Sequence, residues 1–208
     1  VSNIQNKSLE LSLLLSIPAS LGLILASKEI VNALFGYGSF STEDVRLTSE
    51  ALKFFGFGVS AFALVKILSN FFFARDNTLI PFYLSFFIVL LNIIISLSFF
   101  NIIGFIIIPI ATSTTTWLGI LLYIYLLKKR NFFNIEINFL KNFFKILLSS
   151  LFMSLILHYG LDYFSDSLAY NNKFQSIYLI FIVGFVATIY LVSCYLLGVL
   201  KIKNYKTS

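Results

Sequence analysis

One charged residue, Lys66, stands alone within a long apolar stretch, and it is the first candidate for a functional side chain. A charge inside a membrane span is costly and normally faces a wet cavity or a partner. At 100° per residue, Ser69 and Asn70 fall on the same helical face as Lys66, which predicts a polar stripe that lines a cavity. An alternative stays open: Lys66 is eight residues before Ala74, and its long stem could reach the membrane interface.

Two further polar patches lie in the uncharged part of the chain. Ser85, Asn92 and Ser96 share one helical face, and hydroxyl residues occupy all five positions 112–116. Small hydroxyl and amide groups in membranes most often join helices to one another, and lining a cavity is the alternative. We retain four candidate substrate-cavity residues: Lys66, Ser69, Asn70 and Asn92.

The sequence contains no set of residues suited to catalysis or metal binding. No nucleophile stands beside a base, no acids pair within the apolar segments, and no metal-ligand spacing occurs. The one cysteine, Cys194, excludes a disulfide framework and a thiolate metal site, and His158 is the one histidine. We therefore expect no enzyme activity, no cofactor and no bound metal.

The composition is that of a membrane protein. Of the 208 residues, 59% are apolar and 12% are charged, and the mean hydropathy is +0.93. Soluble domains carry about 25% charged residues, so soluble-enzyme and nucleic-acid-binding classes are excluded despite the net charge of +6. The chain opens at Val1 without an initiator Met, and we expect it to be a piece of a longer protein.

Apolar segments of about 20 residues predict an all-α, polytopic membrane protein with about six transmembrane helices. Asn101, Gly104 and Pro109 break one uncharged run into two spans joined by a tight turn. The fifth span is short and is expected to extend back through Phe139–Phe144. The predicted spans are Leu11–Ser27 (continuing to Phe35), Phe54–Ala74, Leu79–Phe100, Gly104–Leu127, Ile146–Leu161 and Phe174–Leu200.

Two polar segments separate these spans. Residues Ser39–Lys53 predict a short amphipathic helix at the outer surface, with Ser41 or Thr42 as its N-cap and acidic residues in its first turn. The basic segment 131–145 predicts a cytoplasmic linker. The predicted organisation is therefore four membrane helices in 1–130, the linker, and a trailing helix pair with a cytoplasmic tail in 146–208.

The basic residues predict the orientation in the membrane, because cytoplasmic loops are enriched in Lys and Arg. With six crossings, the side that holds both termini carries ten basic residues, and the other side carries four. Both termini are therefore expected in the cytoplasm. The ten are Lys7, Arg75, Lys128, Lys129, Arg130, Lys141, Lys145, Lys201, Lys203 and Lys206, against Lys28, Arg46, Lys53 and Lys173.

One region resembles a known family. The turn Phe35-Gly-Tyr-Gly-Ser-Phe40 is followed by Ser41-Thr-Glu-Asp44, and later by the segment 64–81, LVKILSNFFFARDNTLIP. This pattern is similar to that of the MurJ (MviN) lipid II flippases of the multidrug/oligosaccharidyl-lipid/polysaccharide exporter superfamily. Pro81 suits the start of a helix, and Arg75 and Asp76 are expected to anchor a cytoplasmic turn. The residues that match the family pattern are Lys66, Phe72, Ala74, Arg75, Thr78 and Pro81.

The resemblance implies the C-terminal portion of a MATE-like transporter: the remainder of its second lobe and two trailing helices. Such a protein moves lipid II, the undecaprenyl-pyrophosphate-linked peptidoglycan precursor, from the inner to the outer leaflet of the bacterial cytoplasmic membrane by alternating access. The last two helices would hold the polyprenyl tail, and membrane lipids would surround the protein. The alternatives are a superfamily exporter of another lipid-linked oligosaccharide or small molecule, and a non-transporting scaffold subunit. Arg75, Asp76, Thr78 and Pro81 form the expected cytoplasmic loop motif.

The predicted orientation can be tested by cysteine accessibility in intact cells, after replacement of Cys194. A membrane-impermeant thiol reagent should label a cysteine at position 41 and leave one at position 208 unlabelled. The reverse pattern would contradict the orientation, because the ten-to-four basic asymmetry would then face outward.

Overall fold

The computed structural model describes residues 2–170, 172 and 174–200, and these residues form helices and short connections without a strand. Six helices are long and one, α2, is short. The predicted all-α class is confirmed. In chain order the elements are α1 (Ser2–Leu25), α2 (Ser27–Phe35), α3 (Thr42–Phe73), α4 (Leu79–Ile103), the 3₁₀ turn η1 (Gly104–Ile106), α5 (Ile107–Lys129), α6 (Ile137–Tyr163) and α7 (Gln175–Leu196).

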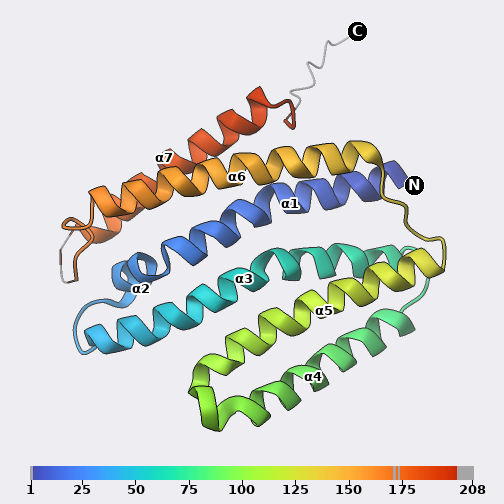
Figure 1. The fold of residues 1–208 in the computed structure, drawn as a ribbon, viewed down its shortest axis with the longest axis horizontal. Coiled ribbons are helices and arrows are strands. Elements are labelled where there is room, and N and C mark those ends of the chain that lie inside the picture. The colour runs from blue at the N-terminus through green and yellow to red at the C-terminus, as the bar shows by residue number, and fades with distance from the viewer. Residues whose placement is uncertain (1, 171, 173, 201–208) are drawn as a thin grey trace.

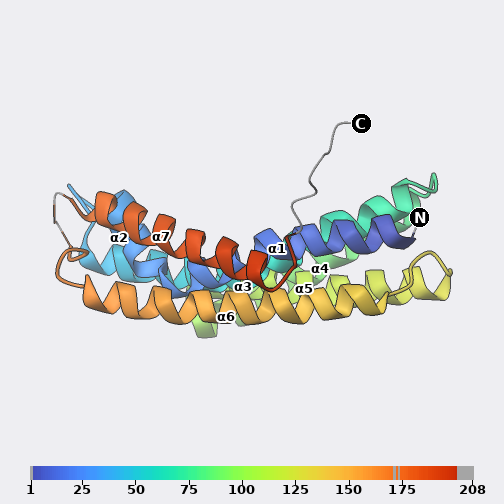
Figure 2. The same cartoon turned by 90° about the horizontal axis from the view of Figure 1, so that it is seen from above.

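The six long helices lie next to one another in a row, in the order α7, α6, α1, α3, α5, α4 (Figure 1). Helix α2 continues from α1 at a changed direction and packs on α3 and α7. Seen from above, the array is long and shallow (Figure 2). Because most helices contact neighbours on two sides only, the two broad faces of the row remain largely exposed.

Five stretches of the described chain are long and apolar enough to cross a membrane. The longest, Leu79–Lys129, folds back on itself, so it supplies two helices and the predicted six spans are present. The predicted tight turn lies at Gly104, which adopts a left-handed backbone (φ 74°) and donates its N–H to Phe100. Glycine suits this position because it has no Cβ to clash there.

The first and fifth spans are longer than their apolar cores. Helix α1 begins at Ser2 rather than Leu11, runs through Pro18 without interruption, and ends before Ala26. Helix α6 extends back through Phe139–Phe144, as expected, and begins at Ile137. The predicted linker 131–145 is therefore too long: only residues 131–136 are non-helical. Hydrophobicity marks the part of a helix inside the membrane, whereas the helix itself continues into the polar flank.

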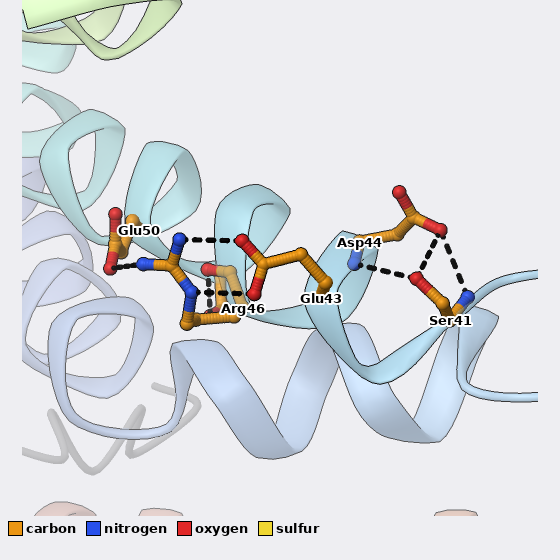
Figure 3. Close-up of polar contacts among 6 residues, drawn as sticks. Ser41, Glu43, Asp44, Arg46 and Glu50 are labelled. Carbon is orange, nitrogen blue, oxygen red and sulfur yellow. Dashed lines mark hydrogen bonds and ion pairs between the residues drawn. The ribbon is translucent and has the colours of Figure 1, made fainter.

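The polar segment Ser39–Lys53 does not form a separate surface helix. It is the first part of α3, whose 32 residues span about 48 Å, so these turns project beyond a hydrocarbon core of about 30 Å. Of the two predicted N-caps, Ser41 and Thr42, the structure uses Ser41: its hydroxyl accepts the N–H of Asp44, whose carboxylate in turn accepts the N–H of Ser41 (Figure 3). This capping box starts the helix.

An ion-pair cluster follows the cap on the same projecting turns (Figure 3). The Arg46 guanidinium lies 2.7 Å from carboxylate oxygens of both Glu43 and Glu50. Hydrogen bonds from Arg46 lower the pKa of Glu43, and bonds from Ser41 lower the pKa of Asp44. All of these groups face water, so screening leaves each pair a small contribution to stability.

The centre of the row is a close contact of α3 with both of its neighbours. Gly56 lies against Leu23 and Ile24 of α1, and Gly58 lies against Ser113 of α5. Glycines let helix backbones approach closely in membranes. Side chains from the neighbouring helices then donate hydrogen bonds to carbonyls of α3: Ser20 to Gly56, Ser113 to Phe54 and Trp117 to Phe57.

The two ends of the row differ in their connections. At the linker end lie the start of α1, the loop 74–78 and the linker 131–136, joined by hydrogen bonds from Asn6 to Asn134 and from Arg75 to Phe132. At the α2 end lie α2, the start of α3 and the α6–α7 connection, joined by a bond from Asn32 to Leu168. Three of the segments predicted to share one side of the membrane, the N-terminal residues, the loop 74–78 and the linker, therefore lie at one end. Lys201, Lys203 and Lys206 of the predicted cytoplasmic tail are outside the described residues.

The close contact predicts that Gly58→Ala destabilises the protein. A Cβ on Gly58 would stand 2.6 Å from Ser113 Oγ and 2.9 Å from Phe62, and moving Ser113 would break its bond to Phe54. We expect a loss of about 1–3 kcal/mol, the usual range for overpacking, in unfolding by denaturant in detergent micelles.

Gly184→Ala is the matched control, because Gly184 is also in the middle of a helix but a Cβ added there would meet nothing within 4 Å. It should be neutral or stabilising by up to about 1 kcal/mol. Equal effects of the two substitutions would argue against the close contact.

Candidate functional site

The candidate residues Lys66, Ser69 and Asn70 lie on one exposed face of α3. Lys66 and Asn70 are exposed, and the Ser69 hydroxyl donates a hydrogen bond of 2.9 Å to the carbonyl of Lys66. Phe62 and Phe73 flank them and are 42% and 46% exposed. We call these five residues the Lys66 face. The ion pairs found in the described chain do not include Lys66, so its charge is available to another group.

A pocket of about 670 Å³ lies beside this face, between α3, α4 and α5 near the linker end. It brings together three predicted residues from consecutive segments: Ser69 of α3, Thr78 of the loop and Pro81 of α4. Ser85, which belongs to the predicted polar patch with Asn92 and Ser96, and Tyr123, which the sequence did not indicate, complete its polar lining. The hydroxyl groups can donate and accept hydrogen bonds, so the pocket suits a polar group at the membrane interface.

The loop motif fixes the junction between α3, α4 and the linker. The Arg75 guanidinium donates to the carbonyls of Phe71 (2.6 Å) and Phe132 (2.8 Å), and it stacks 4.5 Å from the Phe132 ring centre. Asp76 takes a left-handed backbone (φ 54°) at the turn. The guanidinium is therefore engaged within the protein, and its role here is to position the loop. Sequence reasoning missed Phe132, because it is 57 residues away from Arg75.

Helix α4 begins next to this junction. Thr78 is the residue before the helix, and the side chain of Asn77 accepts the N–H of Ile80. Pro81 lies in the first turn, where a missing N–H costs no helical hydrogen bond. The loop motif therefore ends one helix and starts the next within five residues.

Asn92 is separate from the Lys66 face. Its amide nitrogen donates a 2.9 Å hydrogen bond to the Thr112 hydroxyl, and Ser96 lies at the limit of bonding distance, 3.5 Å from its amide oxygen. This arrangement joins α4 to α5, which is the packing role that such groups most often have in membranes. A role for Asn92 in a substrate cavity stays a prediction.

A buried carboxylate near the linker end was not recognised from the sequence. Glu10 is 6% exposed and accepts hydrogen bonds from Lys7 (2.7 Å) and Asn142 (3.0 Å). Burial of a charge is tolerated when it is paired in this way. Glu10 precedes the first apolar segment, so hydrophobicity alone assigns it to a polar flank, whereas α1 extends back to Ser2 and places Glu10 against α6.

Helices α1, α6 and α7 enclose an apolar groove of about 380 Å³. Its lining includes Pro18 and Gly22 of α1, Met153 of α6, and Val186 and Ala187 of α7. At one side of the groove the Tyr190 hydroxyl donates a 2.7 Å hydrogen bond to the carbonyl of Leu14, which satisfies a buried polar group. With no charged lining residue, the groove suits a hydrocarbon chain.

The described residues contain no cluster of three or more His, Cys, Asp or Glu that could hold a metal ion. The described residues present three features: a cation on the exposed Lys66 face, a pocket with hydroxyl groups beside it, and a separate apolar groove. These features could hold different parts of an amphipathic ligand.

Comparison with known proteins gives one family throughout. The family model described as "Lipid II flippase MurJ" matches residues 1–180. A "Probable lipid II flippase MurJ" of Rickettsia prowazekii (strain Madrid E) is 34% identical over 212 residues, which cover 99% of this chain and 40% of that protein. The "Lipid II flippase MurJ" of Thermosipho africanus (strain TCF52B) is 31% identical over 153 residues, or 74% of this chain and 30% of that protein.

A solved structure described as "Lipid II flippase MurJ, inward closed conformation" superposes with a TM-score of 0.76 at 27% sequence identity. The superposition covers 94% of this chain and 38% of that structure. The chain thus spans about two-fifths of the length of the first relatives that it matches. The match to residues 1–180 and the shared fold lead to one conclusion: this multi-pass membrane chain belongs to the MurJ family of lipid II flippases.

Proposed function

We propose that the chain forms the C-terminal portion of a lipid II flippase in the bacterial cytoplasmic membrane: the remainder of the second lobe and the trailing helix pair. The full-length protein moves lipid II from the inner to the outer leaflet by alternating access and makes no covalent change to it. The observation that carries this proposal is the Lys66 face, where an unpaired cation lies within the membrane-spanning part of α3 on the exposed side of the helix row.

Lys66 would attract the pyrophosphate of the substrate. The residue is about 10 Å along α3 from its end at Phe73, so with the loop 74–78 at the membrane interface the charge would lie within a hydrocarbon core of about 30 Å. An unpaired charge at that depth is unfavourable unless water or an anion reaches it. Ser69 and Asn70 supply further polar groups on the same face, and the pocket that holds Thr78 and Pro81 would form its cytoplasmic entrance.

The apolar groove between α1, α6 and α7 would hold the polyprenyl tail. Its lining is apolar along the described length, and its volume of about 380 Å³ accommodates several isoprene units. Burial of each methylene contributes about 0.8 kcal/mol. The groove therefore supplies affinity for the tail, whereas Lys66 supplies attraction for the charged head.

We predict that Lys66→Ala lowers the rate of lipid II flipping by about tenfold or more, the loss typical of one charged hydrogen bond. The control is Lys53→Ala, because Lys53 is also an exposed lysine of α3 but lies in its projecting part. The measurement is lipid II translocation in proteoliposomes of the full-length protein, with Lys66→Arg expected to retain most of the activity. Near-wild-type rates for both alanine variants would show that Lys66 only extends to the interface.

We also predict that Gly22→Leu weakens binding of a polyprenyl phosphate by about tenfold, which corresponds to the loss of two buried methylenes. Gly22 lines the groove, and a Cβ there meets nothing within 4 Å, so the leucine would extend into the open groove. Binding is measured by titration of the detergent-solubilised full-length protein.

The matched control is Gly184→Leu, which also has open space at its Cβ but is not a lining residue of the groove. Unchanged affinity of the Gly22 variant would exclude the groove as the binding site of the tail. A similar loss of affinity in both variants would also contradict the proposal, because the loss would then not depend on the groove.

A further inference from the structure

The first half of the linker 131–136 is anchored at the junction of α3 and α4. The Phe132 carbonyl accepts a 2.8 Å hydrogen bond from Arg75, which follows the end of α3. Phe133 is 2% exposed, and its ring centre lies 5.6 Å from that of Phe71 in the last turn of α3. These contacts hold this half of the linker against the end of α3.

The second half of the linker is anchored to α1 by one side chain. Asn6 is 4% exposed; its amide nitrogen donates a 2.9 Å hydrogen bond to the Asn134 carbonyl, and its amide oxygen accepts the N–H of Glu136 at 3.3 Å. Glu136 is the residue before α6, and within the described chain its own side chain makes no capping bond there. The N–H groups at a helix start need acceptors from outside the helix, so α1 supplies one of the bonds with which α6 begins.

These anchors connect the parts of the protein that carry the two proposed binding sites. The Lys66 face is on α3, whereas α1, α6 and α7 form the apolar groove. The linker is bonded both to the α3–α4 junction and to α1, so it is not a free tether between α5 and α6. The start of α6 therefore keeps a fixed position relative to the end of α3.

We propose that the linker 131–136 is a strap that sets the separation of the Lys66 face and the apolar groove, with Asn6 as its positioning residue. This inference rests on the proposed function, in which the two sites hold the head and the tail of one ligand. Once the tail is bound, the effective concentration of the head at Lys66 depends on how narrowly this separation is fixed. The strap thus raises the affinity for the whole ligand without touching it, and it leaves the affinity for the tail alone unchanged.

The first test compares a polyprenyl diphosphate with a polyprenol of the same length, titrated into the detergent-solubilised full-length protein. Asn6→Ala removes both bonds to the linker, and we expect it to weaken binding of the diphosphate by about fivefold, the usual effect of one lost hydrogen bond. Binding of the polyprenol should not change, which also shows that the groove is intact. Equal weakening of both ligands would assign Asn6 a structural role only and overturn the proposal, as would unchanged affinity for both.

Ser8→Ala is the matched control, because Ser8 is also in the first turns of α1 but its hydroxyl donates to the Ile4 carbonyl of the same helix. It should leave the affinity for both ligands unchanged. A selective loss of diphosphate binding in Ser8→Ala equal to that in Asn6→Ala would overturn the role of the linker bonds.

A distance measurement tests the strap without a ligand. Spin labels replace the exposed residues Lys128 and Lys141, which lie near the end of α5 and the start of α6 and so flank the linker. Asn6→Ala should broaden the distribution of distances between the labels, and Ser8→Ala should not; an unchanged width in Asn6→Ala would overturn the strap. A wild-type protein that bound the diphosphate no more tightly than the polyprenol would instead contradict the proposed function, and the widths would still decide on the strap.

Discussion

The fold depends on the close contact of α3 with α1 and α5 at Gly56 and Gly58. In a bilayer no hydrophobic force drives helices together, so packing and interhelical hydrogen bonds must hold them. The two glycines bring the backbones close, and Ser20, Ser113 and Trp117 then reach carbonyls of α3. Helices α6 and α4 attach to the outer sides of this trio, which gives the row its order.

Hydrogen bonds at both ends hold the trailing pair α6–α7 against this central trio. At the linker end Asn142 bonds to Glu10, and at the α2 end the side chains of Asn32 and Gln175 bond to each other. Between these ends the contact is mainly apolar and leaves the groove open around Gly22. The polar groups thus fix the position of the pair, and the space between them remains available to a hydrocarbon chain.

A single layer of helices cannot enclose a hydrated cavity by itself. The Lys66 face is exposed in this chain, and an unpaired cation on a membrane helix needs either water or an opposing charge. The chain spans about two-fifths of the length of the relatives that it matches. A transport cavity that includes Lys66 therefore requires a second helical layer opposite this face, which is consistent with a two-lobe transporter.

The sequence by itself determined the class, the six spans and the turn at Gly104, and it limited the helix start to Ser41 or Thr42, because hydrophobic length and local backbone preferences act between residues close together in the chain. It also identified Lys66 and its stripe by helical periodicity. Tertiary structure decided the rest. Arg75 contacts Phe132, Glu10 contacts Asn142, and Asn32 contacts Gln175, each across more than 50 residues. Composition cannot specify these pairs, because the order in which helices pack determines which polar groups meet.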